Sequence, residues 1–284
     1  MENNKLQIKL NNRLIDLSTP IVMGIANLTP DSFFWGNRLT SDAAILKCVE
    51  KIIENGGTII DIGGHSTRPG AEMISTEEEI KRLSYGIEVI LKKFPDAIVS
   101  VDTFRSSVAR HMVANYKVAM INDVSGGALD NLMFETIADL KVAYVLMHSR
   151  GNPGTMQQLT DYDNVVSEVL QFLEKRLAQL HLLGVNDVVV DPGFGFAKTL
   201  DQNYRLLNEL SYFQELNVPI LAGISRKSMI SKLLGTDAAN SLNGTTAVNM
   251  LALLGGASIL RVHDVKEAVE TIKIYQQFNL QNSN

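Results

Sequence analysis

The chain has 284 residues and a formal net charge of −5, so it has no surplus of basic side chains with which to bind nucleic acid or an anionic membrane. Apolar residues make up 45% of the chain and charged residues 20%, a composition that is typical of globular proteins and excludes a disordered or collagen-like chain. Its single cysteine, Cys48, excludes an internal disulfide framework and a thiolate metal cluster.

The amino-terminal segment predicts a β-hairpin. Residues 5–17 alternate between apolar and polar side chains around Asn11 and Asn12, a pair that favours a tight turn. We expect this hairpin to cover the amino-terminal end of the domain that follows. No run in the chain reaches the roughly 18 apolar residues of a membrane span, and no leader precedes the hairpin, so we expect a cytoplasmic protein.

Short apolar or β-branched runs recur along the rest of the chain, separated by segments with helical periodicity. Ser75, with glutamates behind it, predicts the start of one helix, and Asp163 or Asn164 the start of another that Gly184 ends. The runs are almost continuously apolar, which is typical of parallel strands covered on both faces. The eight predicted strands are residues 21–27, 58–64, 97–103, 118–125, 142–148, 187–193, 219–225 and 257–264.

This alternation predicts an α/β fold, a single (β/α)8 TIM barrel with a short N-terminal hairpin. We expect the hairpin in residues 1–20, the barrel in residues 21–278 and a frayed carboxyl terminus in residues 279–284. A doubly wound open sheet is the alternative. The sequence argues against it, because residues 193–198 lack the third glycine and the acidic partner of a dinucleotide-binding loop.

Each predicted strand is apolar at its start and polar at its end. In a parallel barrel these ends share one face, where the loops after the strands build active sites. A single Asp or Asn there would be read as a helix cap, but so many together predict a common site. The polar residues are Asn27, Asp61, Asp102, Asn122, Asp123, His148, Asp191, Ser225, Arg226, Lys227, Arg261, His263 and Asp264.

Four of these residues, Asp102, Asn122, Asp191 and Lys227, predict a site for a flat heterocycle. Buried charges are costly without partners, so a polar ligand would be their natural complement. Carboxylates accept paired N–H donors from an amidine-like edge, and a cation suits ring acceptors. A guanine or a pterin has both features.

Asn27, Arg261 and His263 predict a second subsite. They fall on the first and last strands, which become neighbours when the barrel closes. An arginine and a protonatable histidine beside an amide oxygen suit a phosphate or diphosphate with Mg²⁺, an ion that usually keeps several waters.

Seven motifs in this order resemble those of bacterial dihydropteroate synthases, over about residues 21–275. They read Asn-Leu-Thr-Pro-Asp-Ser-Phe at 27–33, Asp-Ile-Gly-Gly at 61–64 followed by Ser-Thr-Arg-Pro-Gly at 66–70, Val-Asp at 101–102, Ile-Asn-Asp-Val-Ser-Gly at 121–126, Asp-Pro-Gly-Phe-Gly-Phe at 191–196, Ser-Arg-Lys-Ser at 225–228 and Arg-Val-His-Asp at 261–264.

The resemblance implies a folate-pathway transferase that joins 4-aminobenzoate to 6-hydroxymethyl-7,8-dihydropterin diphosphate, releases diphosphate and is a sulfonamide target. It implies Mg²⁺ as cofactor, with Asn27 as its ligand, and a homodimer formed through the last helices. The implied pterin-binding residues are Asp102, Asn122, Asp191, Lys227, Phe196 and Met147. Those for diphosphate are Asn27, Arg261, His263, Arg68 and Thr67, and those for aminobenzoate are Phe33, Thr67, Arg68, Pro69 and Ser228. Arg261, His263, Lys227 and Asp102 are the implied catalytic residues.

The implied chemistry needs no strong general base, because an arylamine is uncharged and nucleophilic at neutral pH. Residues 27–38 and 63–73 are rich in Gly, Pro, Ser and Thr, which predicts two lids that exclude water from a cationic intermediate.

The sequence departs from the family pattern beside both predicted lids. Residues 34–37 read Phe-Trp-Gly-Asn where Ser-Asp-Gly-Gly is usual, His65 replaces a usual Glu, and Ser149 replaces a larger residue. We expect Trp35 and His65 to alter aminobenzoate or sulfonamide affinity.

Two other functions fit a pterin-binding barrel. A methyltransferase domain that passes a methyl group to a corrinoid protein would not need Arg261, His263 or the 66–69 segment. A catalytically silent pterin-binding homologue would be expected to have lost some of the charged residues, all of which are present.

Overall fold

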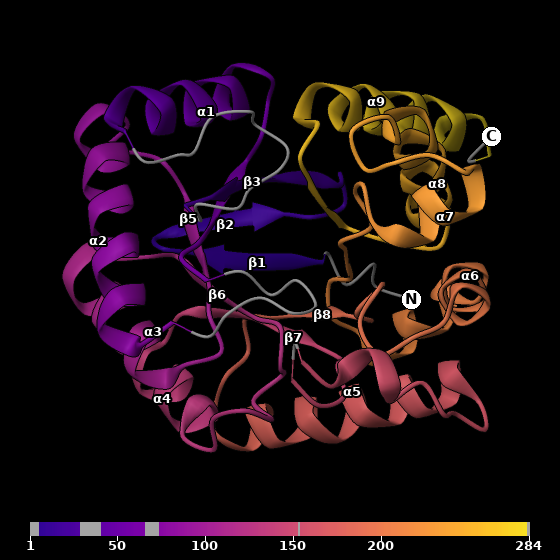
Figure 1. Cartoon of the computed structure of the whole chain (residues 1–284), viewed down its shortest axis with the longest axis horizontal. Coiled ribbons are helices and arrows are strands. Elements are labelled where there is room, and N and C mark those ends of the chain that lie inside the picture. The colour runs from indigo at the N-terminus through magenta and orange to yellow at the C-terminus, as the bar shows by residue number, and fades with distance from the viewer. Residues whose placement is uncertain (1–5, 29–40, 66–73, 153, 283–284) are drawn as a thin grey trace.

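The protein is a barrel of eight parallel strands inside a ring of helices (Figure 1), and the structure, a computed structural model, describes residues 6–28, 41–65, 74–152 and 154–282. The barrel strands are β3 (Ile21–Asn27), β4 (Ile59–Gly63), β5 (Val99–Asp102), β6 (Met120–Asp123), β7 (Ala143–Met147), β8 (Val188–Asp191), β9 (Leu221–Ala222) and β10 (Ile259–Val262). Their order in the sheet is β8-β7-β6-β5-β4-β3-β10-β9, and a parallel bridge between Val190 and Ile220 joins the two edges. All eight predicted strands and the predicted barrel are confirmed.

Helices cover the outer face of the sheet and alternate with the strands along the chain. Their apolar sides pack against outward-facing strand residues such as Ile60, Val101 and Leu146 in one continuous core. The helices are α1 (Asp42–Glu54), α2 (Thr76–Lys93), α3 (Ser106–Tyr116), α4 (Met133–Leu140), α5 (Val165–Leu182), α6 (Leu200–Asn208), α7 (Ser228–Leu234), α8 (Leu242–Leu254) and α9 (Val265–Asn282), with 3₁₀ turns η1 (Met156–Gln158) and η2 (Leu210–Leu216).

The predicted helix starts lie where the sequence places them. The Ser75 hydroxyl accepts a hydrogen bond from the backbone of Glu78 at 3.2 Å and so begins α2. Asn164 begins α5 by accepting from two backbone N–H groups at 3.1 Å, and Gly184, with φ of 80°, follows the end of that helix. Each cap satisfies donors or acceptors that a helix end leaves unpaired.

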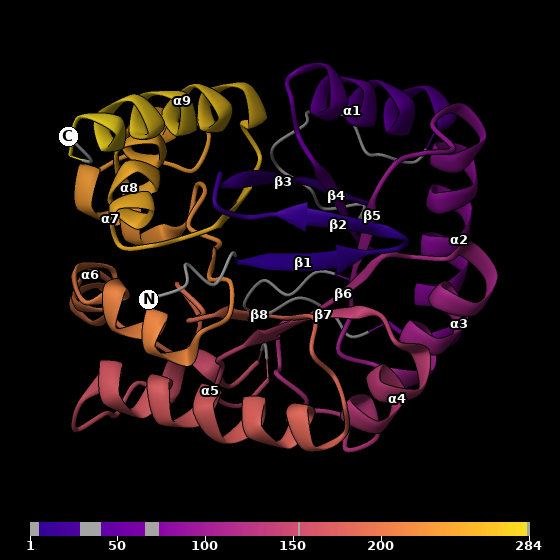
Figure 2. The ribbon, with the colours of Figure 1, turned by 180° about the vertical axis from the view of Figure 1, so that it is seen from behind.

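The amino-terminal hairpin closes one end of the barrel. Strands β1 (Gln7–Leu10) and β2 (Arg13–Asp16) pair antiparallel around Asn11, whose φ of 54° is the left-handed conformation of a tight turn. Figure 2 shows the hairpin across the centre of the ring of helices. Ile8 and Leu10 are buried in a cluster with the first inward-facing residues of the strands, including Met23 and Ile259. The predicted hairpin and its place at the barrel end are confirmed.

Two residues further along the strands, the inward-facing side chains change from apolar to polar and form the floor of the barrel opening. Ile59, Met120, Val189 and Ile259 all belong to the inner apolar cluster. Because side chains in a strand alternate between faces, the residue two positions later also points inward. Those next residues are Asp61, Asn122, Asp191 and Arg261.

No described helix is long and apolar enough to cross a membrane.

Candidate active site

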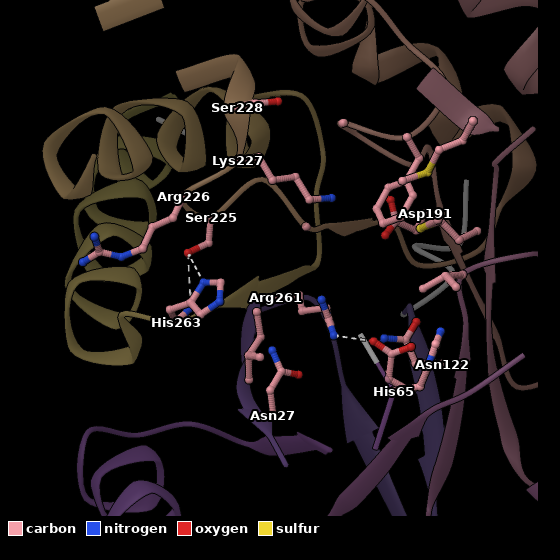
Figure 3. A pocket seen from close by; sticks show the side chains of 18 of the residues that line it. Asn27, His65, Asn122, Asp191, Ser225, Arg226, Lys227, Ser228, Arg261 and His263 are labelled. Atoms are coloured by element: carbon pink, nitrogen blue, oxygen red, sulfur yellow. Dashed lines mark hydrogen bonds and ion pairs between the residues drawn. The ribbon is translucent and has the colours of Figure 1, made fainter. Parts of the chain in front are cut away.

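A cavity of about 520 Å³ opens at the carboxyl ends of the barrel strands, at the end opposite the hairpin. Figure 3 shows labelled side chains converging on it from several strands and from the loops that follow them, with the exception of Arg226. Every predicted site residue that lies in the described part of the chain lines this cavity: Asn27, Asp102, Asn122, Met147, Asp191, Phe196, Lys227, Ser228, Arg261 and His263. Phe33, Thr67, Arg68, Pro69 and Trp35 lie outside the described residues.

Arg261 joins two carboxylates at the bottom of the cavity. Its Nε donates to Asp61 Oδ2 at 2.6 Å, and its Nη2 donates to Asp102 Oδ2 at 2.8 Å. Asn122 Nδ2 donates to the same Asp61 oxygen at 3.0 Å. Asp61 is fully buried, and Asp102 and Asn122 nearly so. The network fixes the orientation of Arg261, Asp102 and Asn122 before any ligand is present.

Asp61 is a site residue that the sequence does not single out for a role. It stands at a strand end and opens the Asp-Ile-Gly-Gly motif but is absent from the predicted site residues, yet it contacts both Arg261 and Asn122. The signal that identifies it is the alternation in β4, since Ile59 belongs to the inner cluster and Asp61 follows two residues later. Within the described part of the chain, its Oδ1 is buried without a hydrogen-bond partner.

Asp191 and Lys227 face each other across the cavity from the ends of β8 and β9 (Figure 3). Asp191 Oδ1 accepts a hydrogen bond from the backbone N–H of Gly193 at 2.7 Å. Lys227 donates to the carbonyl of Phe194 and lies 4.5 Å from the centre of the Phe196 ring. The ammonium group, an aromatic face and a carboxylate therefore surround one part of the cavity, as recognition of a flat polar ring requires.

His263 and Asn27 lie on another side of the cavity, near Arg261 (Figure 3). His263 Nδ1 lies 3.1 Å from the Ser225 hydroxyl, which also accepts from the His263 backbone N–H at 3.2 Å. A Cβ atom added to Gly63 would lie 3.2 Å from Asn27 Oδ1, so the bare backbone of β4 leaves room for this amide. The amide, imidazole and guanidinium groups thus form a polar wall.

Arg226 lies between two inward-facing residues but turns its own side chain away from the cavity (Figure 3). Its guanidinium forms a bidentate ion pair with Asp264, at 2.7 and 2.8 Å, and donates to the carbonyls of Ala238 and Ala239. Its φ of 55° is unusual for a residue with a side chain and marks a tight bend. This ion pair ties the loop after β9, which carries Ser225 and Lys227, to the loop after β10, which carries His263.

His65 belongs to the cavity wall as well. Its side chain is buried next to Phe104, with ring centres 5.8 Å apart, and neither ring nitrogen has a hydrogen-bond partner among the residues that the structure describes. Burial, with Arg105 and Arg82 adding to it, lowers the pKa of His65. An imidazole that is neutral and unpaired here is available to a ligand.

Burial and mutual charge shift the pKa values of the charged cavity residues, and those of Asp102, Asp191 and Lys227 move towards neutral pH. Burial raises the pKa of Asp102 to about 7, against the opposing effect of Arg261. Burial lowers the pKa of Lys227 to about 8, although the Asp191 carboxylate opposes this, and burial raises the pKa of Asp191. Burial alone would lower the pKa of Arg261, but Asp61 and Asp102 outweigh it and raise that pKa. Such shifts cluster at functional sites.

Comparisons with known proteins agree on one family. A family model described as "Pterin binding enzyme" matches residues 23–263. The dihydropteroate synthase of Escherichia coli K12 is 42% identical over 268 residues, covering 92% of this chain and 93% of that protein. A structure of Yersinia pestis dihydropteroate synthase in a sulfonamide drug complex superposes with a TM-score of 0.91 at 36% identity, covering 96% of this chain and 99% of that one. The Xanthomonas albilineans dihydropteroate synthase with 4-aminobenzoic acid gives a TM-score of 0.88 at 38% identity, covering 97% and 99%.

The environment of Asp102 yields a prediction about pH. We expect its carboxyl group to titrate near pH 7 in the free protein, and ¹³C NMR of aspartate-labelled protein, assigned with Asp102→Asn, measures this. Asp61→Asn should lower the pKa by removing a neighbouring negative charge, whereas Arg261→Met should raise it.

The raised pKa of Asp102 also makes the free energy of unfolding depend on pH. Because the folded pKa exceeds that of an unfolded Asp, about 4, the contribution of this group to the free energy of unfolding is complete below about pH 4 and is lost as the pH rises to about 7. A titration midpoint of Asp102 near about 4, the ordinary value of an Asp, would contradict the prediction that this carboxyl group titrates near pH 7.

Proposed function

This chain belongs to the pterin-binding enzyme family and, within it, to the dihydropteroate synthases, and we propose that its described cavity residues divide the work of that reaction as set out below. The protein is a transferase of folate biosynthesis. It condenses 6-hydroxymethyl-7,8-dihydropterin diphosphate with 4-aminobenzoate, releases diphosphate and is a sulfonamide target.

The pterin ring is bound by the acidic floor of the cavity. Asp102 and Asp191 accept hydrogen bonds from the amino and ring N–H groups, because a carboxylate matches a pair of adjacent donors. Asn122 supplies an amide to the ring edge, and Lys227 donates to ring acceptors. Phe196 and Met147 form apolar walls for the flat faces. The observation that carries this proposal is the convergence of these groups, four of them buried, on one cavity from different strands and the loops that follow them.

The diphosphate group lies towards Asn27, Arg261 and His263. The Arg261 guanidinium stays charged at every physiological pH, since its two carboxylate partners raise its pKa. His263 adds a hydrogen-bond donor whose orientation is set by Ser225. We assign Thr67 and Arg68 to the same group as predictions from the sequence, because both lie outside the described residues.

The chemistry follows from this division of charge. The pterin ring can donate electrons to its methylene carbon, so the bond to the leaving oxygen breaks with positive charge spread over the ring. Asp102 and Asp191 stabilise that charge, while Arg261 and His263 stabilise the negative charge that develops on the departing diphosphate. The neutral amine of 4-aminobenzoate then attacks the carbon and loses a proton to water.

Mg²⁺ is part of the proposal, with Asn27 as its protein ligand. The donor set fits: an amide oxygen is a hard ligand, and Mg²⁺ is commonly held by one or two protein oxygens, substrate phosphates and waters. In the described part of the chain no cluster of three or more His, Cys, Asp or Glu side chains could hold a metal ion. When bound, the ion would supply charge neutralisation to the diphosphate.

The aminobenzoate site is proposed at the rim of the cavity, beside Ser228. This residue opens α7 and is exposed, next to Lys227. Phe33, Thr67, Arg68 and Pro69 complete the proposed site from outside the described residues.

A cytoplasmic location also stays a prediction from the sequence.

Two substitutions separate the proposed roles. Lys227→Ala should mainly raise KM for the pterin substrate, by roughly 10- to 100-fold, because a charged hydrogen bond to the ring is lost. Arg261→Ala should mainly lower kcat, on the order of 100-fold, because charge on the leaving group is no longer stabilised. Dihydropteroate formation, assayed with and without Mg²⁺, measures both.

Lys175→Ala, an exposed change on α5, is the matched control and should turn over like the wild-type enzyme. Wild-type kinetics in both cavity variants would refute the site assignment, and equal turnover without Mg²⁺ would refute the metal.

We also propose a homodimer formed by α7, α8 and α9. These helices lie together in both views of the molecule (Figures 1 and 2). Large apolar side chains on them are between 50% and 64% exposed, namely Leu233, Leu234, Leu251, Leu254, Ile274, Phe278 and Leu280. Large exposed apolar side chains on neighbouring helices are typical of a protein interface.

Light scattering coupled to size exclusion tests the dimer. The wild-type chain should have twice the monomer mass, and the double variant Leu251→Asp, Phe278→Asp should be monomeric, because two buried charges would oppose association. Leu182→Asp, at a residue 88% exposed on α5, should remain dimeric. A monomeric wild-type chain would overturn this proposal.

A further inference from the structure

A second lysine lies buried behind the cavity, and neither the proposed chemistry nor the sequence motifs assign it a role. Lys198 follows the Gly-Phe-Gly-Phe segment after β8 and is only 5% exposed. Its ammonium group donates to the carbonyls of Gly193 and Phe196 at 2.9 and 3.0 Å, and lies 3.1 Å from His148 Nδ1. It does not line the cavity.

These contacts fix the loop that carries Phe196. Gly193, Gly195 and Ala197 all have positive φ, at 73°, 81° and 50°, so the backbone turns sharply and directs carbonyls towards the two lysines. Lys198 takes two of those carbonyls, and Lys227 takes that of Phe194. A Cβ atom added to Gly193 would lie 1.9 Å from the His148 carbonyl oxygen, so β7 packs directly against the turn.

Lys198 and Asp191 hold the same residue from two sides, because the ammonium group donates to the Gly193 carbonyl at 2.9 Å and Asp191 Oδ1 accepts from the Gly193 backbone N–H at 2.7 Å. Burial raises the pKa of this carboxyl group, and Lys227, the Gly193 N–H, Arg261 and Lys198 all oppose that effect. Burial lowers the pKa of Lys198 to about 7, and Asp191 is the group that opposes it. Each of these two buried groups therefore favours the charged form of the other.

The remaining groups that face Lys198 are His148, Lys227 and Arg150. Burial, with the nearby charge of Lys198, lowers the pKa of His148 well below its ordinary value, so this imidazole is neutral. Arg150 is paired with Glu168 at 2.6 Å, on the loop and helix that follow β7. Lys198 has three N–H donors and three acceptors in place, if the proton of His148 resides on Nε2.

We propose that Lys198 is a positioning residue of the pterin site, which holds the Phe196 loop in place and keeps the Asp191 carboxylate ionised for the N–H donors of the ring. The inference rests on the proposed pterin site. It adds that Asp191 is supported by a second, buried cation outside the cavity lining, besides Lys227, the cation that contacts the ligand.

Asn203 provides a matched control, because it holds the same loop without a charge. Its Oδ1 accepts from the Gly195 backbone at 2.6 Å, and its Nδ2 donates to the carbonyls of Lys198 and Thr199. A purely structural role for Lys198 would make Lys198→Met and Asn203→Ala alike. A role in the ionisation of Asp191 would separate them.

The experiment measures the titration midpoint of Asp191 by ¹³C NMR of aspartate-labelled free protein, assigned with Asp191→Asn. Lys198→Met should raise this midpoint by on the order of one pH unit, and Asn203→Ala should leave it unchanged. Binding of 6-hydroxymethylpterin at a pH below both midpoints should weaken by about tenfold in Lys198→Met, with less loss at higher pH, where Asp191 is ionised in both proteins. Equal midpoints in Lys198→Met and wild type would overturn the inference.

Two further results keep the outcomes distinct. Wild-type protein that fails to bind 6-hydroxymethylpterin would refute the proposed pterin site, independently of any shift in Asp191. If Lys198→Met does not fold, ¹⁵N NMR of wild-type His148, assigned with His148→Gln, decides the matter. A proton on His148 Nε2 would leave Nδ1 free to accept a hydrogen bond from the Lys198 ammonium group and would support the inference. A proton on Nδ1 would overturn the inference, because that nitrogen could not accept.

Discussion

The ion pairs between one guanidinium group and two carboxylates are the interaction on which the rest of the site depends. Asp61 and Asp102 stand on adjacent strands of a barrel whose next inward layer is apolar, and neither could remain charged there alone. Arg261 contacts both, from β10 on the far side of β3. This pairing leaves a preorganised acidic floor that needs no rearrangement to receive a ligand with several N–H donors.

The basic side chains in and around the cavity have two roles. Some are placed to contact the ligand, and others hold the surrounding loops in position. Lys227 and Arg261 face the cavity and Arg226 turns away from it (Figure 3), while Lys198 lies outside the cavity lining. Arg226 and Lys198 bind backbone carbonyls, and Arg226 also binds the Asp264 carboxylate. The supporting pair ties together the loops after β8, β9 and β10, whose residues contact both proposed subsites. The strand ends alone would set the position of these loops less firmly, because β9 is only two residues long.

Much of this organisation could be predicted from the sequence, because it depends on local patterns. The eight apolar runs, the hairpin around Asn11 and the polar strand ends follow from periodicity and turn chemistry. The partner of Asp61 and the outward turn of Arg226 could not be predicted in this way. Both depend on which side chains meet across strands that are far apart in sequence. Lys198 was beyond prediction for a related reason: its role depends on a turn with three positive φ angles that no single residue type indicates.

The most direct test of the central claim is a crystal structure of this chain with a non-hydrolysable pterin diphosphate analogue. The account predicts one ligand across the cavity, its ring N–H edge on Asp102 and Asp191 and its diphosphate beside Asn27 and His263. A ring bound away from the acidic floor, or a diphosphate on the side of Asp191, would contradict it.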